Sequence, residues 1–163
     1  MNGIQLTLSS LHRGERSMAT ALVAMADGHL RDHEVHHVAI DIAAWSLEHV
    51  QRLAEASARH GTQLDDRRDG ASDDLLAAIL HARSGQETRR PDPRLLLLDD
   101  LRDLHLAATR NSLHWEMLGQ VAQATAAADL LALASSCHPQ TLRQMHWTNT
   151  MIKTLSPQVL SSL

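Results

Sequence analysis

The feature of this sequence that most constrains its fold is a helical stripe in which polar residues interrupt an apolar seam. Five residues recur at intervals of four, three, four and three: Ile42, Ser46, His49, Leu53 and Ala56. This spacing places them on one face of an α-helix, which we expect to face a core. Because Ser46 and His49 are polar, their burial requires hydrogen-bond partners from other helices. The stripe therefore predicts a bundle built around polar groups.

Three further segments show inner faces of a similar kind. In the segment 4–27 a carboxylate lies within the seam: Leu8, Leu11, Glu15, Met18, Leu22 and Met25. In a third helix the seam is Leu97, Leu101, Leu104, Ala108, Asn111, Trp115 and Leu118. In a fourth helix we assign to the inner face Leu142, Met145, His146, Asn149 and Ile152. Spacings of three and four residues predict helices in each segment.

Glycine, proline and aspartate mark the expected helix ends. Gly28 ends the first helix, and Asp32 caps a second helix that runs to about residue 60 and stops at Gly61. Asp92-Pro93 opens the third helix, with a capping side chain followed by proline at the first helical position. The short link between the first two helices makes them antiparallel neighbours.

The remaining boundaries involve an alanine-rich turn, a proline and a long connection. We expect the third helix to end between residues 125 and 128, with Asp129 capping the fourth. Pro139 either kinks the fourth helix or starts a new segment, because its ring and missing N–H disturb a helix interior. The connection 61–93 should contain one short helix, Asp73–Arg83, capped by Ser72.

Composition supports a single all-α domain that spans residues 1–163. The chain has no Phe or Tyr and three Trp, whereas a sheet protein of this size uses many aromatic and β-branched residues. The expected fold is an all-α antiparallel four-helix bundle with one long crossover between the second and third helices.

Charge and hydropathy exclude several classes of partner. The net charge is −4 with one lysine, and no basic run with stacking aromatics suggests nucleic acid. No apolar run approaches the roughly 20 residues of a membrane span. Residues 1–20 lack the pattern of a secretory signal, and Cys137 has no second cysteine to pair with. We expect a cytoplasmic protein that binds neither nucleic acid nor membrane.

Three segments carry a resemblance to a known superfamily. Residues 11–26, LHRGERSMATALVAMA, resemble the opening of ferritin-like proteins. His49–Leu53 is similar to the second helix of that superfamily, and His114–Glu116 with Leu118-Gly119 is similar to its third. In particular, most of the chain outside residues 61–93 resembles small bacterial ferritin-like stress-response proteins. The resemblance implies a ferritin-like bundle, self-association through an apolar helix face, and a site for two metal ions.

The metal site that the resemblance implies is incomplete in this chain. Ferritin-like bundles place a Glu on each of two helices and Glu-x-x-His on each of the other two. Glu15 matches one glutamate, and His49 and His146 match the histidines. Ser46 and Arg143 stand three residues before these histidines, where the pattern has glutamate.

One candidate ligand set nevertheless remains: Glu15, His49, Glu116 and His146. Glu116 is the acid nearest the carboxylate position of the third helix. Two divalent ions carry about four positive charges, which one well-placed carboxylate and two neutral histidines hold poorly. We therefore expect no cofactor, with iron or zinc at these four residues as the alternative.

Arg143 is the residue that we expect to replace the metal. The mapping places it opposite Glu15, whose carboxylate a guanidinium can engage through two parallel hydrogen bonds. Ser46, His49 and His146 would then satisfy the remaining polar atoms of this core ion pair. In the alternative, Arg143 points outwards and Glu15 meets water, because arginine is rarely fully buried.

A second pattern lies at the start of the second helix. Residues 33–37, HEVHH, match the His-Glu-x-x-His helix of zinc proteases, in which two histidines bind zinc and the glutamate polarises water. The position six residues beyond His37 is Ala43 instead of a third ligand, and no sheet is expected to shape a substrate cleft. We expect His33 and His37 to bind Zn²⁺ or Ni²⁺ weakly, without hydrolysis.

These observations favour a non-catalytic or stress-associated binding protein of the ferritin-like type with a degenerate di-iron centre. The alternative is a metal-binding oxidoreductase of the di-iron type with atypical ligands. In either case the resemblance implies a homo-oligomer, which we expect to be a dimer.

Overall fold

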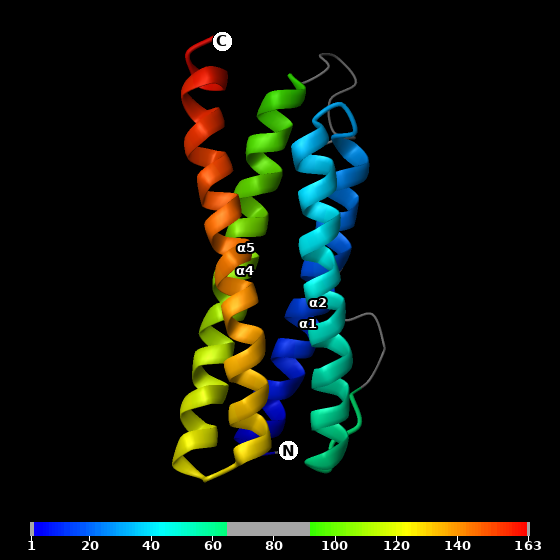
Figure 1. Ribbon diagram of the computed structural model, residues 1–163, viewed down its shortest axis with the longest axis vertical. Helices are drawn as coiled ribbons and strands as arrows, with labels where there is room; N and C mark the ends of the chain where they lie inside the picture. The colour runs from blue at the N-terminus through cyan, green and yellow to red at the C-terminus, as the bar shows by residue number, and fades with distance from the viewer. Residues whose placement is uncertain (1, 65–91, 163) are drawn as a thin grey trace.

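The computed structural model describes residues 2–64 and 92–162, and these residues form a bundle of four long α-helices (Figure 1). The helices are α1 (Gly3–Gly28), α2 (His33–Arg59), α4 (Pro93–Ala124) and α5 (Ala128–Leu160). The structure confirms the expected all-α four-helix architecture.

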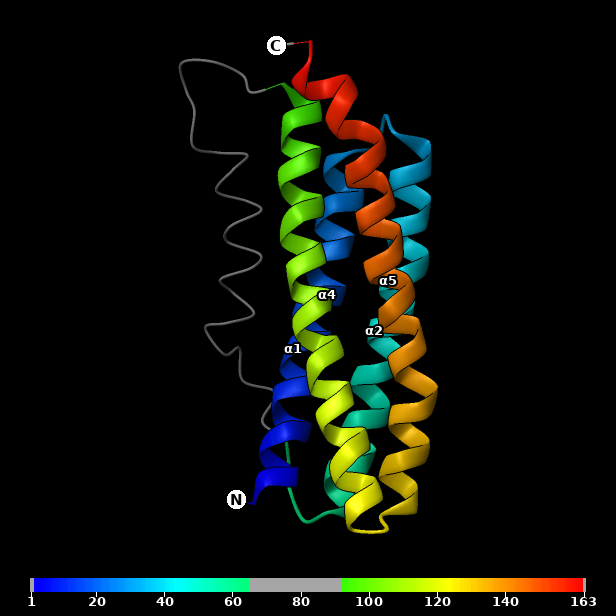
Figure 2. The ribbon, with the colours of Figure 1, turned by 90° about the vertical axis from the view of Figure 1, so that its left-hand side faces the viewer.

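The helices follow an up, down, down, up order. In Figures 1 and 2, α1 rises from the lower end, α2 and α4 descend, and α5 rises to the C-terminus at the upper end. The closest-packed pairs are α1 with α2 and α4 with α5, while α1 also packs on α4, and α2 packs more sparsely on α5. Each of these pairs is antiparallel. Because α2 ends at the lower end and α4 begins at the upper end, the chain between them joins opposite ends of the bundle, as expected.

The expected starts of α2 and α4 are confirmed. The Asp32 side chain accepts a hydrogen bond from the backbone N–H of Val35. The Asp92 side chain accepts from the backbone N–H of Arg94, with Pro93 at the first helical position. Each aspartate satisfies a donor that the first helical turn leaves free.

Gly61 ends α2 as the sequence predicts. Its φ is 75°, and its N–H donates to the Ala58 carbonyl at 3.2 Å. The N–H of Thr62 donates to the Ser57 carbonyl at 2.9 Å. These two bonds form a Schellman motif, which needs a left-handed residue at the position of Gly61.

The second half of the chain corrects the expectation for Asp129 and excludes one of the two alternatives for Pro139. Asp129 is not the cap of α5: the helix begins at Ala128, the cap residue Ala127 makes no side-chain hydrogen bond, and Asp129 accepts from His60 Nε2 at 2.9 Å. Pro139 starts no new segment, since α5 continues through it with the proline on the exposed side. The expected short helix Asp73–Arg83 lies outside the described residues.

The core consists of two apolar clusters stacked along the bundle. The upper cluster includes Met18, Leu22, Met25, Ile42, Leu101 and Leu104, and the lower cluster includes Leu8, Leu11, Leu53, Trp115, Leu118 and Leu130. Every residue of the seams predicted for α1, α2 and α4 is at most 5% exposed, which confirms these three inner faces.

The inner face of α5 differs from the predicted one by a rotation of the helix. Leu142 is 46% exposed, and His146 is also exposed. The buried side chains are instead polar for more than two turns: Thr141, Gln144 and Thr148. Because neighbouring residues on a helix point about 100° apart, assigning Leu142 to the core displaced the whole predicted face.

No helix among the described residues is both long and apolar enough to cross a membrane.

Candidate functional site

A layer of buried polar side chains lies at the middle of the bundle, between the two apolar clusters. All four helices contribute to it: Glu15 from α1, Ser46 and His49 from α2, Asn111 from α4, and Thr141 and Gln144 from α5. Each of these six residues is at most 2% exposed. Buried polar groups need partners, so the contacts within this layer decide what it does.

Glu15 lies at the centre of the layer. Its Oε1 accepts hydrogen bonds from Trp115 Nε1 at 2.8 Å and from Thr141 Oγ1 at 3.3 Å. The same oxygen lies 3.2 Å from Nδ1 of His49. Oε2 is fully buried and has no hydrogen-bond partner among the described residues. One oxygen thus takes all the contacts of this carboxylate.

His49 forms a buried pair with Glu15. Nε2 donates to Oε1 of Gln140 at 2.7 Å, and the ring meets the Trp115 ring edge-on with centroids 5.6 Å apart. Burial lowers the pKa of His49, but contacts with Cys137 and Glu15 outweigh it and raise the pKa to about 10. The contact with Glu15 therefore favours the protonated form of His49, with Nδ1 making a close ionic contact instead of a well-aligned hydrogen bond.

Gln144 and Asn111 connect the layer to α2 and α1, respectively. Gln144 Nε2 donates to the Ile42 carbonyl and to Ser46 Oγ, both at 2.9 Å, which ties α5 to α2. Asn111 lies so close to Gly14 that a Cβ at that position would collide with its side-chain oxygen. Because Gly14 has no side chain, Asn111 can pack directly against α1.

The layer has the spacing of a two-metal site but not its chemistry. It contains Glu15 on α1, Ser46-x-x-His49 on α2, Asn111 on α4 and Thr141-x-x-Gln144 on α5. The i, i+3 spacing and the helix distribution match the Glu-x-x-His and Glu pattern of di-metal bundles. Only Glu15 and His49 have the ligand type of the pattern, and the other four positions are neutral. One carboxylate beside an imidazolium does not fit two divalent ions.

The structure corrects the expected ion pair of Glu15 with Arg143. Arg143 lies on the exposed side of α5, and its neighbour Gln144 faces the core. The positive partner of Glu15 is His49. The alternative expectation for Arg143, that it points outwards, is the one that the structure supports.

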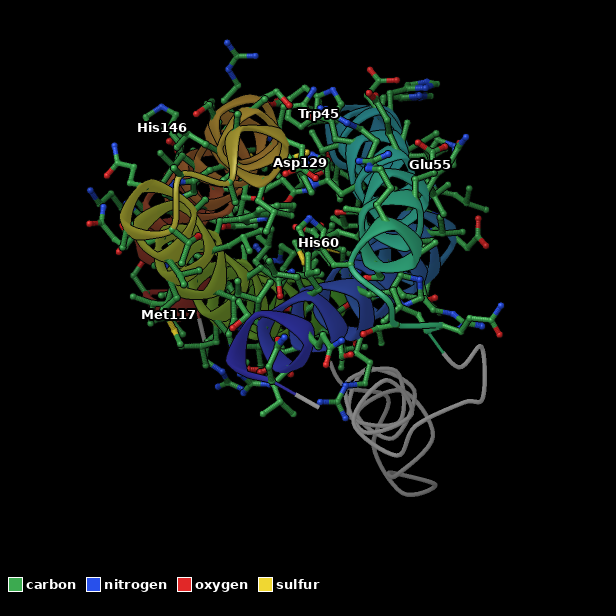
Figure 3. The ribbon with its side chains drawn as sticks, turned by 90° about the horizontal axis from the view of Figure 1, so that it is seen from below. Trp45, Glu55, His60, Met117, Asp129 and His146 are labelled. Carbon is green, nitrogen blue, oxygen red and sulfur yellow. The ribbon has the colours of Figure 1, made fainter. Side chains whose placement is uncertain are left out.

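The candidate metal ligands are not brought together either. Glu116 and His146 are exposed, away from the buried Glu15 and His49. Figure 3, which looks along the bundle, places His146 at its outer surface. Across residues 2–64 and 92–162, no group of three or more His, Cys, Asp or Glu side chains has an arrangement that could hold a metal ion.

The other candidate pair, His33 and His37, does come together. Both side chains are exposed on the first turns of α2, and their rings stack with centroids 6.3 Å apart.

Sequence reasoning missed Thr141 and Gln144, as well as a buried pair near the upper end. His29 Nε2 lies 2.8 Å from Oδ2 of Asp100, whose side chain is 1% exposed. The signal for Asp100 was its position three residues after Leu97 on the seam of α4. Thr141 and Gln144 carried a similar signal, since they are polar residues at spacing three.

Comparison with protein families, with curated proteins and with solved structures finds no match.

Proposed function

We propose that this protein is a ferritin-like bundle in which hydrogen bonds and one ion pair take the place of a di-iron centre, and that it acts as a non-catalytic, stress-associated binding protein. The observation that carries the proposal is the central polar layer. Its six positions keep the helix distribution and spacing of a di-metal site, while four of them hold neutral side chains.

The contacts of the layer support a structural role for it. Gln144 donates to Ser46, where a di-metal bundle would have a histidine near a glutamate. Thr141 donates to Glu15, and His49 supplies the positive charge that balances that carboxylate. His49 and Thr141 both contact Oε1 of Glu15, and the positive charge of His49 opposes the binding of divalent ions near the buried acceptors that remain, Glu15 Oε2 and Gln144 Oε1. The proposed association with stress rests on the resemblance of residues 11–26 and 49–53 to ferritin-like stress-response proteins.

Metal analysis of the untagged protein tests the proposal directly. After dialysis against a chelator, we expect no stoichiometric iron or zinc, and no reduction of dioxygen when ferrous iron is added. Glu15→Gln and His49→Gln variants serve as matched controls. One or two ions per chain that survive dialysis, and that either substitution removes, would overturn the proposal in favour of a di-iron oxidoreductase with atypical ligands.

A gain-of-binding variant tests the mapping of the positions. Ser46→Glu, Asn111→Glu, Thr141→Glu and Gln144→His together restore the ligand types of the pattern. We expect the combined variant to bind two divalent ions per chain, because hard cations need several carboxylate oxygens. A control with Gln in place of each new Glu should bind none. A folded variant that fails to bind would show that these positions do not correspond to a di-metal site.

We also propose that the protein forms a homodimer through α4. Three large apolar side chains are more than half exposed along this helix: Leu106, Leu113 and Met117. Their spacing of seven and four places them on one stripe, as at a helix-helix interface. Light scattering after gel filtration should report twice the chain mass, and Leu113→Glu should yield monomers. A monomeric wild-type protein would contradict this proposal.

A further inference from the structure

The start of α2 gathers histidines outside the central layer. His33 and His37 are one helical turn apart, and both are exposed. Their rings are nearly parallel, with an angle of 15° between the planes and centroids 6.3 Å apart. Residues four apart lie on the same face of a helix, so both imidazoles can approach one point in solvent.

Neighbouring contacts hold this turn in place. His36 Nδ1 lies 2.9 Å from the Ala26 carbonyl of α1, which fixes its ring. The edge of that ring meets the ring of His37, with centroids 5.1 Å apart. The Asp32 side chain caps the helix through the N–H of Val35. His37 thus packs against a ring that is tied to α1.

We propose that His33 and His37 form a surface site for one divalent transition-metal ion of the Cu²⁺, Ni²⁺ or Zn²⁺ class, with water completing its coordination. Imidazole suits these three ions, and among them the general order of affinity favours Cu²⁺. Metal–nitrogen distances of about 2.1 Å require the two rings to approach each other from their centroid separation of 6.3 Å, which two exposed side chains can do. Glu34, in the first turn of α2, offsets the unfavourable field of the helix N-terminus.

The same geometry argues against hydrolysis at this site. A catalytic zinc has three protein ligands and an open position for water. The structure pairs the imidazoles of His33 and His37, while Nδ1 of His36 lies against the Ala26 carbonyl of α1 and Glu34 is exposed to solvent. The site binds an ion, and water fills the positions that a third ligand and a substrate would need.

Copper titration of the untagged full chain tests this site. Calorimetry should show one principal site per chain, and electron paramagnetic resonance should show coupling of the Cu²⁺ to two nitrogens. His33→Ala and His37→Ala should each lower the affinity by about 100-fold, because each removes one arm of a chelate. His146→Ala removes an exposed histidine with no histidine one turn away and should leave the titration unchanged.

Two results would overturn the inference. One is a two-nitrogen signal that persists in the double variant His33→Ala/His37→Ala with circular dichroism unchanged. The other is a wild-type affinity no higher than that of either single variant. The Glu15→Gln variant should bind Cu²⁺ as the wild type does, because Glu15 lies in the central layer. The copper titration therefore tests the His33–His37 site independently of the proposal for the central layer.

Discussion

Replacing Glu15 with glutamine probes the buried ion pair, because it removes a charge without changing side-chain shape. The amide oxygen of the variant can still accept from Trp115 and Thr141, so the main loss is the ionic contact with His49. The pKa of His49 lies at about 10 in the folded protein, against an ordinary value of 6.5. That difference corresponds to about 5 kcal/mol of stability shared between its partners Cys137 and Glu15. We expect Glu15→Gln to lower the free energy of unfolding by about 3 kcal/mol, the lower end of the cost of breaking a buried pair.

The pH dependence of the free energy of unfolding provides an independent check that the pair of Glu15 and His49 stabilises the fold. Because folding raises the pKa of His49, the pair stabilises the protein fully below the unfolded pKa of 6.5. This stability is lost as the pH rises through 10, by about 1.4 kcal/mol per pH unit between the two values. In the Glu15→Gln variant the stability should fall less steeply over the same pH range, because the variant loses the part of the raised pKa of His49 that Glu15 causes, while the part from Cys137 remains.

Urea unfolding followed by circular dichroism, between about pH 6 and about pH 9, measures both quantities. Glu116→Gln is the matched control, since it removes an exposed carboxylate of α4 and should change the free energy of unfolding by less than about 0.5 kcal/mol. A loss below about 1 kcal/mol for Glu15→Gln, with an unchanged pH profile, would refute the reasoning. It would mean that Glu15 and His49 are buried as a neutral pair.

Three further predictions concern the backbone and the overall fold. Circular dichroism should show a helix-dominated spectrum, and a strand content near one-fifth, the ordinary level of mixed folds, would contradict the architecture. Gly14→Ala should destabilise the fold by about 1–3 kcal/mol because its Cβ collides with Asn111, whereas Gly119→Ala should stabilise it by up to about 1 kcal/mol, since the nearest atom to its Cβ lies 3.8 Å away. Urea unfolding of the two variants measures the contrast, and equal effects would contradict it. Ala126→Gly should raise the free energy of unfolding by about 1 kcal/mol in the same assay, because Ala126 holds a φ of 54° at the end of α4; an unchanged value would show that this strain is absent.

Much of the fold could be predicted from local patterns. The seams of α1, α2 and α4 are continuous at spacings of three and four, and every predicted member is buried. The caps at Asp32 and Asp92 and the turn at Gly61 follow from the chemistry of single residues, which acts within five positions along the chain. The length of the connection between α2 and α4 then excluded a simple up-down order.

The sequence by itself placed Glu15 and His49 on inner faces, because each interrupts an otherwise regular seam. Tertiary structure alone decided what these residues contact. The inner face of α5 is polar at Thr141 and Gln144, and Leu142 is exposed. The spacing of apolar residues therefore could not show which face of this helix is buried. Neighbouring residues on a helix point about 100° apart. The core position that was predicted for Arg143 is therefore occupied by the next residue, Gln144. The partner of a buried charge is set by which helices pack together across the bundle, and that information is absent from the spacing within any one of them.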